Sequence, residues 1–196
     1  MDIQQFLKFT EILNIFKRTH RVVKAHDKDR LENDAEHSHQ LAVLAMYVIS
    51  VKKLPLNLEK IISYALVHDL VEIYAGDTDA FGTEEDKATK HKREKEAQEK
   101  LKQEFPEFNE LHKLIESYEE KADPESRFLS SLDKVLPVVN IYLGQRDWYH
   151  RRDISFDELV TNKREKTKID ETCHELWSQI EQLLENEKDE LFPKKL

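Results

Sequence analysis

The 196-residue sequence contains little glycine, proline or cysteine. Three glycines and five prolines leave few residues suited to tight turns, which argues against a β-rich fold and favours long helices. The single cysteine, Cys173, excludes an intrachain disulfide and suits a reducing cytosol, so we expect a cytoplasmic location. No apolar run reaches the roughly 18 residues of a transmembrane helix, and the acidic start is unlike a signal peptide. We therefore expect neither a membrane span nor a leader.

What the chain does contain is charge. Charged residues make up 36% of it, and the formal net charge is −9. Such an acidic balance disfavours nonspecific binding to nucleic acid or anionic membrane, although it is compatible with a local basic pocket. The expected partner is therefore a small molecule. A chain of this length suits one sizeable core better than two independent ones, and its many Glu, Lys, Leu and Ala residues favour helices. We predict one all-α domain over residues 1–196.

Apolar periodicity predicts a series of helices with short connections. Their expected ranges are 3–13, 34–53, 58–76, 84–104, 107–121, 124–146 and 156–187, with Asp34, Asn57 and Thr83 as N-caps. Residues 19–33 lack a clean period, which predicts a long functional loop or a broken helix. The C-terminal residues 187–196 are expected to fray.

Four ionisable side chains interrupt the stretch YALVHDLVEIYAGD, residues 64–77, which otherwise has the pattern of a buried helix. His68 and Glu72 continue the inward stripe that begins at Ile61, and Asp69 lies on the neighbouring stripe. Burying such groups unpaired costs several kcal/mol, so they should have partners, and a metal ion is one candidate.

Two further helices carry ionisable groups at inward positions. His37 is in line with Leu41, whereas His39 lies about 200° round the same helix and should not share its site. Asp133 interrupts the apolar stripe of the 124–146 helix, where a plain ion pair with Lys134 is the ordinary alternative. Imidazoles and carboxylates without thiolates suit Mn, Co, Fe, Zn or Mg and disfavour structural zinc. Each residue alone favours an ordinary structural role, but their joint placement on three helices does not.

The order His … His-Asp … Asp resembles the HD-domain superfamily of metal-dependent phosphohydrolases. The segments RLENDAEHSHQLAVLAM, HDLVEIYAGD, KHKREKEA and SLDKVL are similar to those of its single-domain bacterial 5′-deoxynucleotidases, over about residues 18–145. The resemblance implies a single helical HD-type domain, with the metal site between core helices and the helices at about 156–187 packed on that core. It implies one divalent metal ion held by His37, His68, Asp69 and Asp133.

The same resemblance assigns Glu72 and Asp77 to the hydrolytic water and the leaving group. Glu72 shares a helical face with His68 and lies between apolar neighbours, which can raise its pKa and suit it to proton exchange. Asp77 follows Gly76, a helix C-cap candidate at which the chain can turn back over the site. An ordinary turn aspartate explains Asp77 equally well from the sequence alone.

A phosphomonoester also needs a cation, and arginine suits bidentate phosphate recognition. The family's phosphate-binding arginine precedes the first metal histidine by about fifteen residues, which implies Arg21, with Arg18 as the alternative. The family follows this arginine with a tryptophan that contacts the sugar, but here Val22 or Thr19 stands in that place. Sugar and base selectivity are therefore open. Arg30 also matches an arginine of the family, although a structural ion pair explains it equally well.

These observations favour a metal-dependent phosphomonoester hydrolase acting on (deoxy)nucleoside 5′-monophosphates. The alternatives are an HD phosphodiesterase, a hydrolase of another small phosphate ester, and a non-catalytic nucleotide-binding module. Glu72 and Asp77 argue against the last of these, because a module that only binds needs no proton-transfer groups. The KHKRE run, with His91 and Arg93, is expected to be a solvated helix face. A homodimer through the helices after residue 145 is a further expectation.

Overall fold

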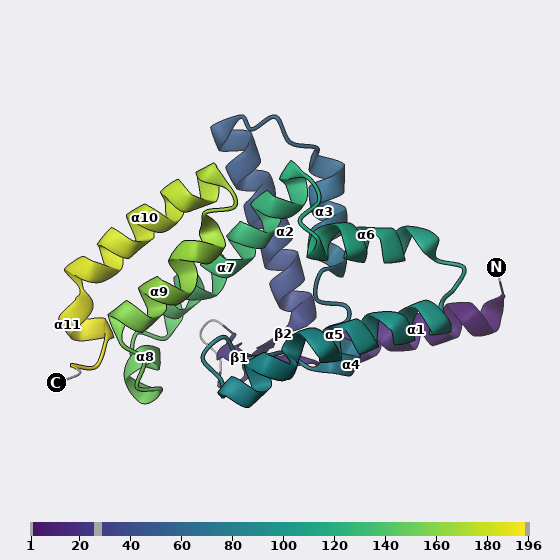
Figure 1. Ribbon diagram of the computed structural model, residues 1–196, viewed down its shortest axis with the longest axis horizontal. Helices are drawn as coiled ribbons and strands as arrows, with labels where there is room; N and C mark the ends of the chain where they lie inside the picture. The colour runs from purple at the N-terminus through teal and green to yellow at the C-terminus, as the bar shows by residue number, and fades with distance from the viewer. Residues whose placement is uncertain (1, 26–28, 195–196) are drawn as a thin grey trace.

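The computed structural model describes residues 2–25 and 29–194, and helices make up most of them (Figure 1). The elements in chain order are α1 (Ile3–Phe16), β1 (His20–Lys24), β2 (Leu31–Asn33), α2 (Asp34–Lys52), α3 (Leu58–Val67), α4 (Glu72–Ala75), α5 (Glu84–Glu104), α6 (Asn109–Glu119), α7 (Pro124–Gly144), α8 (Trp148–Arg151), α9 (Phe156–Thr167), α10 (Glu171–Asn186) and α11 (Lys188–Leu191). The predicted all-α class is confirmed. Within the described ranges, no helix is long and apolar enough to cross a membrane.

Polar side chains start the helices where the sequence places N-caps, with one difference. The side chains of Asn57 and Thr83 accept hydrogen bonds from backbone N–H groups of α3 and α5, as predicted. At α2 the cap is Asn33 and not Asp34. Asn33 accepts from the Glu36 N–H at 3.0 Å, and the Glu36 carboxylate accepts from the Asn33 N–H at 3.2 Å. Asp34 is therefore the first helical residue, and it is buried.

Residues 20–24 and 31–33 form two paired strands, so the prediction of a loop or broken helix over 19–33 is wrong for these residues. Strand β1 pairs antiparallel with β2, with His20 opposite Asn33. Val23 of β1 is buried, and the backbone of Lys24 exchanges hydrogen bonds of 3.3 and 3.1 Å with the Gln145 side-chain amide. A strand this short carries too few residues for a clear period, which is why its pattern was missed. Residues 26–28 lie outside the described part.

Two predicted helices are each divided, and one predicted frayed end is ordered. The 58–76 helix is interrupted at residues 68–71, where backbone bonds span three residues, as in Glu72 N–H to Asp69 C=O at 2.9 Å. The 156–187 helix ends at Thr167, and Asp170 caps the next helix by accepting from the Cys173 N–H at 2.9 Å. The C-terminal segment was expected to fray, yet Phe192 is buried and stacks on Tyr149, with ring centroids 4.6 Å apart.

Helix α7 is the central element of the fold. It contacts α2, α3, α6, α9 and α10, and the β1 strand also packs against it. Figure 1 shows α8 to α11 on one side of α7, α3 and α6 on the other, and α1 with α5 along the lower edge. Residues carried by α2, α7 and the turn after α3 can therefore meet in the interior.

Candidate active site

Three segments bring four ionisable side chains into contact. His37 comes from α2, His68 and Asp69 from the turn after α3, and Asp133 from α7. His37 Nε2 lies 2.8 Å from Asp133 Oδ1, and His68 Nε2 lies 3.1 Å from Asp69 Oδ2. The two crossed pairs, His37 to Asp69 and His68 to Asp133, are each 3.9 Å apart. The structure thus gathers the four residues that the sequence suggests as metal ligands.

The spacing of these atoms fits one divalent ion. Two atoms that each lie about 2.1 Å from a common ion cannot be more than about 4.2 Å apart, and the four histidine-to-aspartate distances satisfy this. His68 Nδ1 lies 3.0 Å from the Ala65 carbonyl, so a proton on Nδ1 can be donated there while Nε2 faces the cluster. Donor atoms of His37, His68 and Asp69 all lie within 4.8 Å of one another. This His/Asp group is able to bind a metal.

The electrostatics of the cluster favour ionised carboxylates. Burial alone would raise the pKa of Asp69, but His68 and Arg21 hold it far below its usual range. For Asp133, burial is likewise outweighed, by Lys134 at 2.6 Å and by His37, so its pKa is also low. Burial lowers the pKa of His37, which keeps it neutral at neutral pH. The carboxylates raise that of His68 against the effect of burial. A bound cation would displace that proton, because ligating histidines are unprotonated at the metal.

Two more carboxylates lie beside this cluster. Glu72 is buried at the start of α4, and its Oε2 has no hydrogen-bond partner among the described residues. Burial, followed by the charges of Asp69 and Asp77, raises the pKa of Glu72 well above its ordinary value. Burial also raises the pKa of Asp77. Gly76 has φ +73°, a conformation that favours glycine, and the turn it permits brings Asp77 to the same cavity as Glu72.

Arg21 projects from β1 into this site, and Arg18 does not. Arg21 Nη1 lies 2.7 Å from Asp69 Oδ2, and Arg21 is also 3.7 Å from each of two buried acids, Glu32 and Asp34. Burial raises the pKa of Glu32 to about 7 and that of Asp34 to about 8. Arg18 is exposed and pairs with Glu11 at 3.3 Å.

Sequence reasoning missed Glu32 and Asp34, because residues 19–33 were not expected to form strands. Glu32 belongs to β2 and Asp34 is the first residue of α2, so no single periodic pattern in the sequence links the two.

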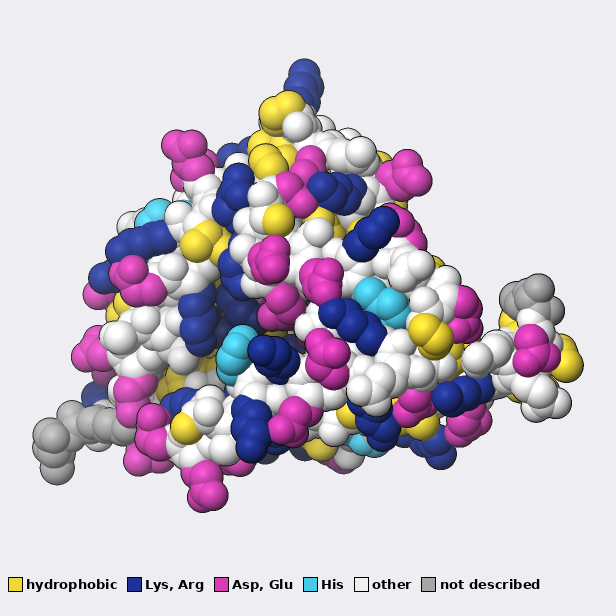
Figure 2. Space-filling view, turned by 45° about the vertical axis from the view of Figure 1, so that its right-hand side comes forward, with side chains coloured by type: hydrophobic (Ala, Val, Ile, Leu, Met, Phe, Trp, Pro, Cys, Tyr) yellow, Lys and Arg dark blue, Asp and Glu magenta, His cyan; other side chains and the backbone are white. Residues whose placement is uncertain are grey.

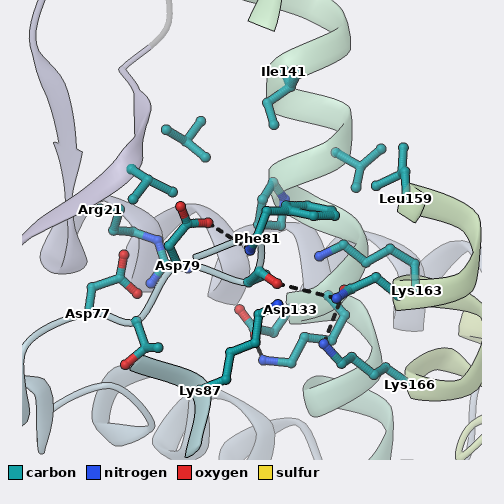
Figure 3. A pocket seen from close by; sticks show the side chains of 18 of the residues that line it. Arg21, Asp77, Asp79, Phe81, Lys87, Asp133, Ile141, Leu159, Lys163 and Lys166 are labelled. Atoms are coloured by element: carbon teal, nitrogen blue, oxygen red, sulfur yellow. Dashed lines mark hydrogen bonds and ion pairs between the residues drawn. The ribbon is translucent and has the colours of Figure 1, made fainter. Parts of the chain in front are cut away.

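A cavity of about 480 Å³ opens beside these groups (Figure 3). In Figure 3, Arg21 and Asp77 lie on one side of it, Lys163 and Lys166 on the other, and Asp133 between them. Apolar side chains, among them Ile141 and Leu159, lie at the end away from Lys87. Its ionisable lining residues are Arg21, Asp69, Glu72, Asp77, Asp79, Lys87, Lys90, Asp133, Lys134, Lys163 and Lys166. The lysines were not singled out from the sequence, because surface lysines on helices are common.

The HD domain family model matches residues 13–177 of this chain. The chain belongs to the HD domain family. It is 35% identical over 135 residues to the human 5′-deoxynucleotidase HDDC2, a match that covers 68% of this chain and 63% of that protein. It is 26% identical over 136 residues to the 5′-deoxynucleotidase hdd1 of Schizosaccharomyces pombe, covering 66% and 67% of the two chains. The chain thus spans somewhat less than two thirds of the length of its human relative.

A solved structure supports the HD fold over nearly the whole chain. The predicted metal-dependent phosphohydrolase from Magnetospirillum magnetotacticum superposes with a TM-score of 0.81 at 22% identity, covering 97% of this chain and 96% of that one. A conserved hypothetical protein from Pyrococcus furiosus superposes with a TM-score of 0.62 at 21% identity, over 91% and 99% of the two chains. The match to the Magnetospirillum magnetotacticum structure therefore extends over the helices after α7.

In this HD domain, Arg93 has a role that the sequence did not indicate. It was expected on a solvated helix face without a catalytic function. Its guanidinium donates to the Ala75 carbonyl at 2.5 Å and to the Thr78 hydroxyl at 2.9 Å. These bonds tie α5 to the turn that carries Asp77, so Arg93 positions one wall of the cavity.

Proposed function

We propose that this HD-family chain is a metal-dependent phosphomonoester hydrolase that acts on nucleoside 5′-monophosphates. The observation that carries the proposal is the cluster of two histidines and two aspartates, with histidine-to-aspartate distances of 2.8 to 3.9 Å, beside two carboxylates of raised pKa. The relatives named 5′-deoxynucleotidase support the nucleotide part of the proposal.

His37, His68, Asp69 and Asp133 would hold the ion. When bound, a divalent cation lowers the pKa of a coordinated water and polarises a phosphate oxygen. Glu72 then exchanges protons: burial and the charges of Asp69 and Asp77 raise its pKa well above its ordinary value, which suits its carboxyl group to donate a proton to the leaving sugar oxygen. Asp77 faces the same cavity and orients the attacking water.

Arg21 anchors the phosphate in this proposal. Its guanidinium presents several N–H groups, and an incoming phosphate can share them with Asp69. The apolar end of the cavity, with Ile141 and Leu159, suits the sugar and base. Val22 also lines the cavity, at the position that follows the phosphate arginine.

The test is phosphate release by the metal-loaded protein from nucleoside 5′-monophosphates, nucleoside 3′-monophosphates and a phosphodiester. We expect release from the 5′-monophosphates. His37→Ala should abolish it, whereas His39→Ala, on the exposed face of the same helix, should leave it unchanged. Release from the diester alone would replace the proposal with a phosphodiesterase. Binding of nucleotides without any release would replace it with a non-catalytic module.

We also propose a homodimer and a cytoplasmic location. Four large apolar side chains of α2, Val43, Met46, Tyr47 and Val51, are exposed at helical spacing and form one apolar stripe. This stripe supports an interface on α2 better than one after residue 145, where the exposed large apolar residues in the described part are Ile169 and Leu183. Sedimentation of wild type and Tyr47→Glu tests the dimer.

The free, buried thiol of Cys173 supports a reducing compartment, which fractionation of native cells tests.

A further inference from the structure

The cavity has more cationic side chains than one phosphate requires. Five lysines line it: Lys87, Lys90, Lys134, Lys163 and Lys166. This concentration occurs in a chain of net charge −9. Figure 2 shows Lys and Arg side chains gathered around a hollow in one face, with acidic side chains spread over the surrounding surface. Such a local inversion of charge favours an anionic ligand.

Four of the five lysines have partners in the protein. Lys134 pairs with Asp133 at 2.6 Å, Lys87 with Glu84 at 3.0 Å, and Lys90 with Glu94 at 3.2 Å. Lys166 donates to the Asn162 side chain at 3.0 Å. Lys163 differs from all of them, because its ammonium has no hydrogen bond or ion pair with any residue that the structure describes.

Lys163 is also the most buried of the set. It projects from α9 into the cavity with 5% of its surface exposed. Burial, followed by the charges of Lys134 and Lys166, lowers the pKa of Lys163 to about 7. A buried ammonium between like charges is unfavourable unless an anion compensates it. No acidic side chain among the described residues forms an ion pair with the Lys163 ammonium, so a bound anion would supply the missing counter-charge.

The position of these lysines separates them from the predicted phosphate anchor. Figure 3 shows Lys163 and Lys166 reaching into the cavity from the side opposite Arg21 and Asp77. Asn162 holds this side in place, since its amide donates to the Ala80 carbonyl at 3.4 Å while its oxygen accepts from Lys166. A phosphate bound at Arg21 and the metal ligands would leave Lys163 and Lys166 free to meet a second group.

We propose that Lys163, together with Lys166, forms a second anion subsite that holds an additional phosphate group of the substrate. The preferred substrates are then nucleotides with two phosphate groups. This inference rests on the proposed nucleotidase function and defines its substrate class. The second phosphate can be attached to the sugar, as in a nucleoside 3′,5′-bisphosphate, or to the first phosphate, as in a 5′-diphosphate. The chemistry at the lysines is the same for both.

The experiment compares phosphate release from adenosine 5′-monophosphate, adenosine 3′,5′-bisphosphate and adenosine 5′-diphosphate by metal-loaded wild type, Lys163→Met and Lys168→Gln. Lys168 is a matched control, because it is an exposed lysine at the end of the same helix. We expect kcat/KM to be higher for one of the two-phosphate substrates than for the monophosphate. Lys163→Met should lower the ratio of kcat/KM for this two-phosphate substrate to kcat/KM for the monophosphate by about 10-fold or more. Lys168→Gln should not change this ratio. The substrate with the higher ratio identifies where the second phosphate is attached.

A second measurement keeps the subsite testable apart from turnover. Sulfate should raise the Tm of wild type and Lys168→Gln more than that of Lys163→Met, because a ligand that binds the folded state stabilises it. Equal sulfate shifts in all three proteins would overturn the subsite. A ratio that Lys163→Met leaves unchanged would overturn the substrate assignment, and equal losses on all substrates would assign Lys163 to the scissile phosphate. If no nucleotide is hydrolysed, the proposed function itself fails, and a Lys163-dependent sulfate shift would support only the anion subsite.

Discussion

Glu72 illustrates how burial can adapt a carboxylate to proton transfer. Its side chain is buried beside Asp69 and Asp77, and these negative charges add to the effect of burial in raising its pKa. Asp69 is half-buried, yet His68 and Arg21 lower its pKa. The pKa values of two carboxylates three positions apart in the chain are thus shifted in opposite directions, which suits one to metal binding and the other to acid catalysis.

The first prediction concerns Glu72. Glu72→Gln should retain its metal and lose about 10²- to 10⁴-fold in kcat, the usual contribution of a general acid or base. Elemental analysis and phosphate release measure the two quantities on the same sample. A variant with full metal content and near-normal kcat would move proton transfer to Asp77.

The second prediction concerns Arg21 and the sugar. A hydrophobic pocket rejects an added hydroxyl by only about 10²-fold even in a well-formed case, and here Val22 offers less of a wall than tryptophan. We therefore expect a weak preference for deoxyribonucleotides. Arg21→Ala should lower kcat/KM for ribo- and deoxyribonucleotides alike, because both share the phosphate. Arg18→Ala, which removes only an exposed partner of Glu11, should have little effect.

Two results would contradict this prediction, one on the sugar preference and one on the two arginine variants. A strong deoxyribonucleotide preference in wild type would mean that another residue replaces the tryptophan wall. Full activity in Arg21→Ala combined with loss in Arg18→Ala would reverse the assignment of the phosphate anchor.

At the level of helices and strands, periodic segments were predicted well and short irregular ones were not. The range of α5 agrees with the prediction, and that of α7 ends two residues earlier than expected. The Thr83 cap of α5 and the apolar stripe of α7 are local signals. The β1–β2 hairpin depends on packing of Val23 and on the Gln145 amide, which lies 121 residues from Lys24 in the chain. Contacts of that separation leave no periodic trace in the sequence, so Glu32 and Asp34 were missed with the hairpin.

The C-terminal segment shows the same limitation and gives the third prediction. Phe192 is buried, stacked on Tyr149 and edge-on to Phe156 at 5.4 Å. Phe192→Ala should lower the free energy of unfolding by about 3 kcal/mol, the lower end for loss of a buried phenylalanine. Lys194→Ala, at an exposed position, should change it by less than about 0.5 kcal/mol. Urea titrations compare the two. Equal stabilities would mean that this segment frays after all.

At the scale of the whole molecule, charge is distributed unevenly. Helix α7 carries Asp133 of the proposed metal site, and α9 carries Lys163 and Lys166 on the opposite side of the cavity. The four proposed metal ligands were singled out from the sequence because they interrupt apolar stripes and because their order resembles that of the HD-domain superfamily. The lysines could not, because Lys87 and Lys163 belong to different helices whose approach only the fold defines. Burying Lys163 next to the positive charges of Lys134 and Lys166 should also lower the free energy of unfolding.

The fourth prediction is that Lys163→Met is more stable than wild type at neutral pH. The pKa of Lys163 is about 7 in the folded protein and 10.5 in the reference state. Between these pH values the unfolded wild-type chain binds more protons at Lys163 than the folded protein does. The free energy of unfolding of wild type therefore rises with pH, whereas Lys163→Met lacks this group and this contribution. The difference should be largest below pH 7, on the order of a few kcal/mol, and should shrink towards pH 10. The charges that face Lys163 are Lys134, Lys166, Asp133 and Arg21. Urea titrations across this pH range would contradict the account if the difference were constant.

The metal centre is tested most directly by removing and restoring its ion. After chelation, wild type should release no phosphate from a nucleoside 5′-monophosphate, and one equivalent of Mn, Co, Fe, Zn or Mg per chain should restore release. Asp69→Ala lacks a ligand that lies within 3.9 Å of both histidines, so it should retain no metal and regain no activity. Phosphate release by the metal-free protein, or a full equivalent of metal in active Asp69→Ala, would contradict a hydrolytic metal centre at these four residues.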